Sequence, residues 1–361
     1  MNDIDKILGL QIKTGETPSV VYCLFNADKI IKSVFLGYAD VKTKKPADEN
    51  TFYKAFSITK TFTALAVMQL AEQKKIDIGR PVIQYLPDFP YSAQITIKEI
   101  LSHSAGIPNP IPLEWIHSAS EHPSFNRDQF FAEIFKKYNH VKFAPNEKFA
   151  YSNLGYFLLG QLIEKVSGEK YETFIQKNIL KKLDLDASSI GFEINSSQAT
   201  GYNKKYSVAN FIIGFFIDKS KYMLPSVGQW KPYINFYPDG VSYAGLIGKP
   251  AAFVKYIQSL LKKNSVLLSD TYKQIMLTEN CTINNKPTGM CLGWFKGQLN
   301  GIEYYAHAGG GGGYYSELRF YPGEKIGSVI FFNRTGMSDE RCLDKIDKYY
   351  FEKATGLPSP W

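Results

Sequence analysis

The sequence predicts a mixed α/β protein in which buried and amphipathic helices pack with paired strands. Residues 61–68 are uncharged and mostly apolar, which is typical of a helix inside a globular core. Residues 253–263 combine one apolar and one polar face, as an amphipathic helix does. Residues 317–321 and 328–332 alternate or run apolar like two paired strands, with a Pro-Gly turn between them. The chain has 361 residues, 44% of them hydrophobic, and no linker or repeat, so it is globular and large enough for two lobes.

Ser57 and Lys60 stand three residues apart at the start of the apolar helix. Residues at i and i+3 share a helix face, with Cβ atoms roughly 5–6 Å apart, so the hydroxyl and the amine can exchange a proton. A serine hydroxyl is a weak nucleophile unless a base lies beside it. Burial disfavours the charged form of lysine, which allows the lysine to be that base. We interpret the pair as catalytic. The alternative is a purely structural role, in which the two side chains hydrogen-bond at the start of the helix.

The Ser-x-x-Lys pattern alone is not specific, because it occurs three times in this chain. Ser167 is followed by a glycine, which indicates the end of a helix. Ser259 and Lys262 fall in the amphipathic helix, whose polar face we expect to carry both side chains into solvent. The copy at Ser57 is the one followed by a stretch, residues 61–68, that we expect to form a wholly buried helix.

Tyr151 and Asn153 form a second motif, at the start of a helix predicted to run to about residue 168. A tyrosine can shuttle protons, and an asparagine can orient a substrate amide or the lysine. The same Tyr-x-Asn spacing occurs at Tyr233 and Asn235, without a clear helix after it. A purely structural role for the tripeptide is the alternative.

His307 begins a third motif, which continues into five successive glycines, Gly309 to Gly313. A phosphate-binding loop would end in Gly-Lys-Ser/Thr and open a helix, and this segment does neither. The chain continues instead as strands. A glycine beside a strand lets a ligand approach closely, and its backbone N–H can serve an oxyanion. A flexible hairpin is the alternative.

The three motifs, in this order, resemble those of the serine β-lactamase and penicillin-binding-protein-like hydrolases. The similar branch contains class C β-lactamases, D-stereospecific peptidases and family VIII esterases. Residues 77–87, 100–107 and 244–247 resemble further segments of that family, so the resemblance covers nearly the whole chain. Class A enzymes and penicillin-binding proteins have Lys-Thr-Gly as the third motif. This chain departs from that pattern, because its third motif begins with His307.

The resemblance implies a two-lobe α/β (α+β) fold of the β-lactamase type. An antiparallel sheet would be covered by N- and C-terminal helices, beside a mostly helical lobe. The split lobe would take residues 1–74 and 246–361, the helical lobe residues 75–245, and both would form one catalytic unit with the site between them. The expected strands are 20–26, 29–38, 292–299, 302–308, 316–321 and 326–333, with a C-terminal helix over 339–355.

The resemblance also implies a role for each motif. Ser57 would be the nucleophile, Lys60 the proton relay and Tyr151 the general base for acylation and deacylation. Asn153 would orient the relay or the substrate amide. The implied activity is hydrolysis of an ester or amide through an acyl-enzyme, as in an esterase or a D-amino-acid peptidase.

The third motif would supply the oxyanion hole and part of the substrate site. The backbone N–H groups of Ser57 and Gly310 would form the hole, with Gly309 beside them. His307 replaces a lysine that attracts a substrate carboxylate, and a mostly neutral imidazole would attract it less. This favours neutral esters or amides over β-lactams. A β-lactamase or D-Ala-D-Ala carboxypeptidase, and a non-catalytic binding or scaffold protein on the same fold, are the alternatives.

Composition excludes other classes of partner. The net charge is +8, but the lysines are scattered, so we expect no nucleic-acid partner and a small ester, amide or peptide substrate instead. Four cysteines without CxxC spacing and five histidines without HExxH spacing indicate no metal, and no cofactor is implied. We expect His103 to bond within its own turn, and the other three histidines before His307 to lie at the surface: His117, His122 and His140.

Four further features of the sequence bear on localisation and on the site. The longest apolar run, residues 211–217, is far shorter than the roughly 20 residues of a membrane span. Residues 210–240 are rich in aromatics and predict either a substrate-shaping flap or ordinary packing. Residues 240–244 approach the Gly-x-Ser-x-Gly of α/β-hydrolases but end in alanine. Residues 1–6 show no basic start before an apolar core, which indicates the cytoplasm, with export from a longer precursor as the alternative.

Overall fold

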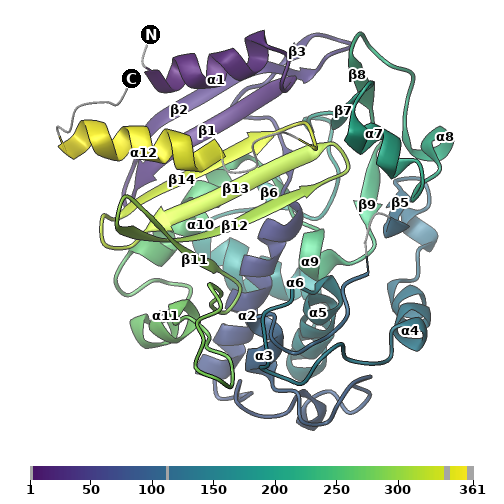
Figure 1. Ribbon diagram of the computed structural model, residues 1–361, viewed down its shortest axis with the longest axis vertical. Coiled ribbons are helices and arrows are strands. Elements are labelled where there is room, and N and C mark those ends of the chain that lie inside the picture. The colour runs from purple at the N-terminus through teal and green to yellow at the C-terminus, as the bar shows by residue number, and fades with distance from the viewer. Residues whose placement is uncertain (1–2, 111–113, 337–341, 356–361) are drawn as a thin grey trace.

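The computed structural model describes residues 3–110, 114–336 and 342–355 of the chain. Its largest element is a seven-stranded antiparallel sheet with the order β11-β12-β13-β14-β1-β2-β3 (Figure 1). The first strand, β1, lies between β14 and β2, so the two ends of the chain meet in one sheet. The strands are β1 Ser19–Asn26, β2 Ile30–Asp40, β3 Lys45–Pro46, β11 Phe295–Leu299, β12 Ile302–Gly311, β13 Tyr314–Tyr321 and β14 Ile326–Phe332.

Two terminal helices, α1 (Asp3–Lys13) and α12 (Cys342–Thr355), cover one face of this sheet. Successive residues of β1 point to opposite faces, as the pleat of a strand requires. Tyr22 and Leu24 pack with the two helices, whereas Cys23 and Phe25 pack with the core on the other side. The alternation gives the sheet two apolar faces, and each face needs a cover.

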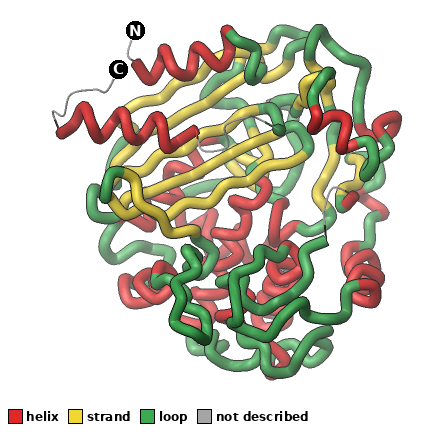
Figure 2. The backbone as a smooth tube through the Cα atoms, in the orientation of Figure 1, coloured by secondary structure: helices red, strands yellow, loops and turns green. Residues whose placement is uncertain are grey.

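The second face packs against α10 (Pro250–Leu261), and α2 (Thr59–Glu72) belongs to the same buried core. Thirteen of the 14 residues of α2 are buried, because other helices pack around it. Next to α2 lie α5 (Asn153–Ser167) and the short α9 (Val241–Ala244). Figure 2 shows the strands gathered in one part of the molecule and the helices and long loops of the other part packed below them.

Short elements make up the rest of the described chain. The helices are α3 Ile97–Leu101, α4 Arg127–Lys137, α6 Tyr171–Ile175, α7 Val208–Ile213, α8 Lys219–Tyr222 and α11 Asp270–Leu277. Single turns are η1 Phe56–Ile58, η2 Val82–Gln84, η4 His122–Ser124, η5 Gln176–Leu180 and η6 Lys181–Leu183. Small sheets are formed by β4 Tyr53–Lys54, β10 Ile247–Gly248 and β6 Ile190–Gly191, by β5 Ile116–Ser118 and β9 Phe236–Pro238, and by β7 Tyr202–Lys204 and β8 Trp230–Pro232.

The predicted antiparallel sheet and its two covering helices are present, with shifted ends. β12 continues through three glycines to Gly311, because Gly309 to Gly311 still pair with β13. β11 begins at Phe295, three residues later than predicted. The C-terminal helix is seen from Cys342, and the predicted start at 339–341 lies outside the described residues. The division at residues 74 and 246 stays a prediction.

The two other Ser-x-x-Lys copies differ in outcome. Ser167 ends α5, and Gly168 caps the helix with a φ of 72°, as predicted. Ser259 was expected in solvent but is 7% exposed, because α10 packs beneath the sheet and Ser259 bonds the Ser265 hydroxyl at 2.7 Å. Among the helices of the described ranges, none has the length and apolarity needed to cross a bilayer.

Candidate active site

Ser57 lies in the η1 turn, between the β4 strand and the start of α2. The preceding residue, Phe56, has a φ of 45°, a left-handed conformation that is costly for an aromatic residue. Its ring packs between Phe236 and Tyr314, at centroid distances of 6.4 and 6.2 Å, and this packing holds the turn. The strained turn fixes the direction in which the Ser57 hydroxyl leaves the backbone.

Lys60 is fully buried one helical turn beyond Ser57. Its Nζ lies 3.0 Å from Ser57 Oγ and 3.0 Å from the Tyr243 carbonyl oxygen. No carboxylate of the described residues forms an ion pair with it. Burial alone therefore sets its charge state and lowers the pKa of the Lys60 ammonium well below 10.5. The shift favours the neutral amine beside Ser57, which is the form that can accept a proton.

Tyr151 comes to the same point from the helical half of the molecule. Its ring centroid lies 4.8 Å from Lys60 Nζ. Burial raises the pKa of the Tyr151 phenol above its ordinary value of 10, and a hydrogen bond with the Ser57 side chain opposes that shift only in part. The phenol is protonated at neutral pH, so Tyr151 meets Ser57 as a neutral group. The structure thus brings Ser57, Lys60 and Tyr151 together.

The position of Tyr151 is fixed by His103 and by the start of α5. Ser152 caps α5 by accepting a hydrogen bond from the Gly155 N–H at 3.0 Å. The Ser152 N–H donates to His103 Nδ1 at 3.1 Å, and the imidazole ring lies against the Tyr151 ring at 4.3 Å. The expectation that the His103 side chain bonds within its own turn is wrong, because this bond spans 49 positions. Burial, with a smaller effect of Lys60, lowers the pKa of His103 well below 6.5.

Asn153 is the first residue of α5 and lies at the same cavity as Ser57. Its side-chain Nδ2 and its backbone N both donate to Asn109 Oδ1, at 3.1 and 3.0 Å. Asn109 therefore holds Asn153, a supporting role that the sequence reasoning missed. Its signal in the sequence is weak, a single asparagine between two prolines.

The glycine strand lies directly against the turn that bears Ser57. A Cβ atom on Gly309 would stand 2.1 Å from the Ala55 carbonyl oxygen and 2.8 Å from the Ser57 nitrogen, so only glycine fits there. Gly310 differs, because its Cβ would meet ordinary contacts at 3.5 Å and beyond. Gly310 lines the cavity beside Ser57, where its backbone N–H can serve a substrate oxygen.

His307 is 1% exposed on β12, with its ring near those of Tyr151 and Phe295. Its Nδ1 lies 2.8 Å from the Ala308 carbonyl oxygen, to which it donates in the neutral ring. Burial, and after it the nearby Lys60, lowers the pKa of His307 to about 3. His307 is therefore neutral across the physiological range and offers an acceptor at Nε2 instead of a cation.

A cavity of about 240 Å³ opens at Ser57. Tyr151, Asn153 and the strand at Gly310 form its polar side. The apolar side is formed mainly by Trp115, Ile116, Ile213, Ile217, Tyr233 and Tyr243. The aromatic segment 210–240 is thus divided: part of it borders the cavity, whereas Phe211 and Phe215 face outward.

The sequence matches the family model described as Beta-lactamase over residues 4–350. The chain belongs to the β-lactamase family. This confirms the family resemblance that the three motifs indicated. In this family setting the geometry at Ser57, Lys60 and Tyr151 is a candidate active site, while the role of each side chain remains a proposal.

Two curated relatives are of moderate similarity to this β-lactamase family member. Protein flp of Staphylococcus aureus (strain N315) is 29% identical over 245 residues, which cover 64% of this chain and 48% of that protein. Penicillin-binding protein 4* of Bacillus subtilis (strain 168) is 27% identical over 293 residues, covering 77% of this chain and 60% of the relative. The chain spans only about half to three-fifths of the length of these relatives.

Solved structures confirm the β-lactamase-like fold. The D-amino acid amidase from Ochrobactrum anthropi SV3, complexed with D-phenylalanine, has a TM-score of 0.80 and 19% identity, with 98% of each chain covered. The octameric penicillin-binding protein homologue from Pyrococcus abyssi has a TM-score of 0.78 and 23% identity, covering 98% of this chain and 77% of that one.

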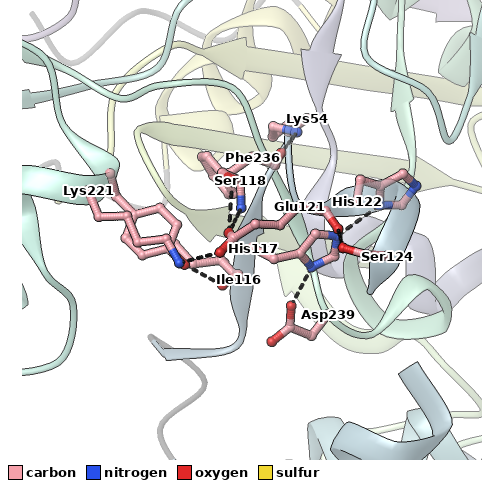
Figure 3. A network of polar contacts seen from close by, with 11 residues as sticks. Lys54, Ile116, His117, Ser118, Glu121, His122, Ser124, Lys221, Phe236 and Asp239 are labelled. Carbon is pink, nitrogen blue, oxygen red and sulfur yellow. Dashed lines mark hydrogen bonds and ion pairs between the residues drawn. The ribbon is translucent and has the colours of Figure 1, made fainter. Parts of the chain in front are cut away.

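A polar network beside the cavity corrects the prediction that His117 and His122 lie at the surface. His117 is 6% exposed, with Nδ1 2.6 Å from Asp239 Oδ1 and Nε2 2.8 Å from Nδ1 of the partly buried His122 (Figure 3). The pairing of β5 with β9 brings Asp239 to His117 across 122 residues, which no local pattern signals. Within the described ranges, no three His, Cys, Asp or Glu side chains gather as metal ligands would. His140 is exposed as predicted.

The contacts of the two glycines give a matched test of the strand's role. We expect Gly309→Ala to lower the free energy of unfolding by about 1–3 kcal/mol and to abolish activity, because the added methyl group would push the Ser57 turn away. Gly310→Ala keeps the backbone N–H, and its methyl group makes only ordinary contacts. We therefore expect its free energy of unfolding to lie within about 1 kcal/mol of that of the parent. Thermal denaturation and ester hydrolysis measure both effects. Equal stability and activity of the two variants would contradict the close approach.

Proposed function

We propose that this protein is a serine hydrolase that cleaves an ester or amide bond through an acyl-enzyme on Ser57. The proposal rests above all on Lys60, a buried amine whose Nζ lies 3.0 Å from Oγ of Ser57, and Ser57 lines a cavity. Burial lowers the pKa of Lys60 and so favours its uncharged form. Burial of a lysine is unfavourable because the ammonium group loses its hydration, and no carboxylate of the described residues compensates that loss for Lys60. Such a lysine therefore indicates a functional role. Activation of a serine nucleophile is a role of this kind.

In the first step, Lys60 Nζ takes the proton from Ser57 Oγ while that oxygen forms a bond to the substrate carbonyl carbon. The carbonyl π electrons move to oxygen, and the backbone N–H groups of Ser57 and Gly310 would stabilise the resulting oxyanion. The sequence favoured Tyr151 as the base. Since burial keeps the phenol protonated and favours the neutral form of the amine, we assign the base to Lys60.

Tyr151 would then complete the proton transfer. As the tetrahedral intermediate collapses, the bond to the leaving group breaks, and the leaving oxygen or nitrogen takes the phenol proton of Tyr151. Tyr151 regains a proton from the Lys60 ammonium, whose Nζ lies close to the phenol ring. Water repeats the sequence on the acyl-enzyme, with Lys60 as base and Ser57 as leaving group. His103 acts as a positioning residue, because it orients Tyr151 without reaching the reacting atoms.

The cavity supports a small, uncharged acyl group as substrate. Its volume of about 240 Å³ and its apolar wall suit a short chain or a single side chain. The third motif begins with His307 where related enzymes have a lysine, and the neutral imidazole offers no positive charge to a substrate carboxylate. The D-amino acid amidase of similar fold supports amide hydrolysis as one version of this activity. Penicillin-binding protein 4* is the relative that supports the alternative, a β-lactam-recognising enzyme.

A serine-directed fluorophosphonate should modify Ser57, and Ser57→Ala should abolish the labelling. Mass spectrometry of the labelled peptide identifies the site. Ser242→Ala is the control, because the Ser242 hydroxyl is buried and donates to the Tyr156 carbonyl oxygen at 3.0 Å. Labelling that persists in Ser57→Ala but disappears in Ser242→Ala would place the nucleophile elsewhere.

Tyr151→Phe removes the proposed proton donor and leaves the ring packing in place. We expect kcat to fall roughly 10²–10⁴-fold, the usual contribution of a positioned acid or base, with little change in KM. Tyr233→Phe is the matched control, because Tyr233 also lines the cavity but its hydroxyl accepts from Asn203 Nδ2 at 3.0 Å. A larger loss of kcat in Tyr233→Phe than in Tyr151→Phe would show that the wrong phenol was chosen.

The neutral state of His307 predicts both substrate preference and its pH dependence. We expect kcat/KM for a short-chain p-nitrophenyl ester to exceed that for nitrocefin, and the ratio to stay constant between about pH 6 and 8. A group with a pKa of about 3 does not change its charge in that interval. Steady-state kinetics with both substrates measure the ratio. Faster turnover of nitrocefin than of every neutral ester and amide would favour the β-lactamase alternative.

A further inference from the structure

Exposed apolar side chains of this protein are concentrated in one segment. Thirteen large hydrophobic residues of the described chain are well exposed, and six of them lie between residues 206 and 224. We call these six the outer patch: Tyr206, Val208, Phe211, Ile212, Phe215 and Leu224. Tyr206 is 87% exposed and Phe215 72%. Isolated exposed apolar residues are ordinary, but a cluster of this kind indicates an interaction surface.

The outer patch lies on and around α7 and α8, at the edge of the molecule (Figure 1). Ile217 of the same segment is buried, and Ile213 and Ile217 both line the candidate catalytic cavity. Phe211 and Phe215 point the other way and pack edge to face at 5.2 Å. The segment is therefore anchored by its inner side chains and presents an apolar ridge outward.

The segment that carries this ridge is rich in lysine. Residues 204–231 contain five lysines and one aspartate, and no other charged residue. Lys205 is exposed, lies over the Tyr206 ring at 4.9 Å, and forms no ion pair with a described residue. Lys204 and Lys221 pair with glutamates from other parts of the chain, at 3.0 and 2.7 Å. Lysines beside exposed aromatic rings suit a partner that has anionic groups at its surface and an apolar layer beneath them.

We propose that the outer patch docks onto an anionic lipid bilayer. Aromatic and aliphatic side chains bury into the boundary between headgroups and acyl chains, and lysines beside them are attracted by anionic headgroups. A second copy of this chain fits less well, because an isologous contact would set the same lysine-rich surfaces against each other. Docking needs no spanning helix, since the ridge only enters the interface. The inference concerns binding and does not depend on hydrolysis at Ser57.

Vesicle co-sedimentation of the full chain tests the proposal directly. We expect binding to vesicles of phosphatidylcholine with about one-third phosphatidylglycerol, and little binding to phosphatidylcholine alone or in 0.5 M salt. The double variant Phe211→Ser/Phe215→Ser should bind at least about tenfold more weakly, because it loses the two aromatic rings of the ridge. Lys205→Glu should weaken binding about fivefold or more, since it reverses one charge at the surface.

The double variant Val266→Ser/Ile283→Ser is the matched control. These two side chains are 60% and 72% exposed but lie outside the outer patch, so their loss should leave vesicle binding unchanged. Thermal unfolding of each variant verifies that it is folded. Equal binding of the parent and of Phe211→Ser/Phe215→Ser, or no binding to anionic vesicles, overturns the proposal. Light scattering that shows an oligomer in the parent and a monomer in that variant also overturns it, in favour of a second copy.

Discussion

The candidate site depends on the burial of one amine. Lys60 stands on a helix that is surrounded by apolar side chains, and its partners there are Ser57 Oγ and the Tyr243 carbonyl oxygen. Moving an ammonium ion out of water costs several kcal/mol, so burial favours the uncharged form and lowers the pKa of Lys60. The rings of Tyr151, Tyr156 and Tyr243 lie within 4.8–5.8 Å of Nζ and keep water away from it. The same desolvation keeps Tyr151 and His307 neutral.

Three separate elements meet around this amine, each held by a contact that tolerates little change. The start of α2 supplies Ser57 and Lys60 on a strained turn. The strand β12 approaches that turn so closely that Gly309 has no room for a side chain. The start of α5 supplies Tyr151, which His103 holds through the neighbouring backbone N–H. The sheet and the helical half must therefore pack correctly before the site exists.

The segment 204–231 connects this site with the surface of the molecule. Its inner residues Ile213 and Ile217 form part of the cavity wall, while Phe211 and Phe215 remain exposed. The sequence showed the segment as rich in aromatics but could not separate packing from binding. Both descriptions hold for different residues of the same short stretch, because neighbouring side chains of α7 and of the turn after it point in different directions.

Local sequence determined the elements and the chemistry that neighbouring residues share. Helix geometry fixes the distance between positions i and i+3, so the Ser57–Lys60 pair was predictable, and strand alternation gave most of the sheet to within a few residues. Only the tertiary structure decided what lies next to these groups. The bonds from His117 to Asp239 and from Asn153 to Asn109, and the burial of Ser259, join segments or faces that no local pattern relates. The charge states of Lys60 and His307 likewise follow from burial, which is a property of the packed molecule and not of the residue.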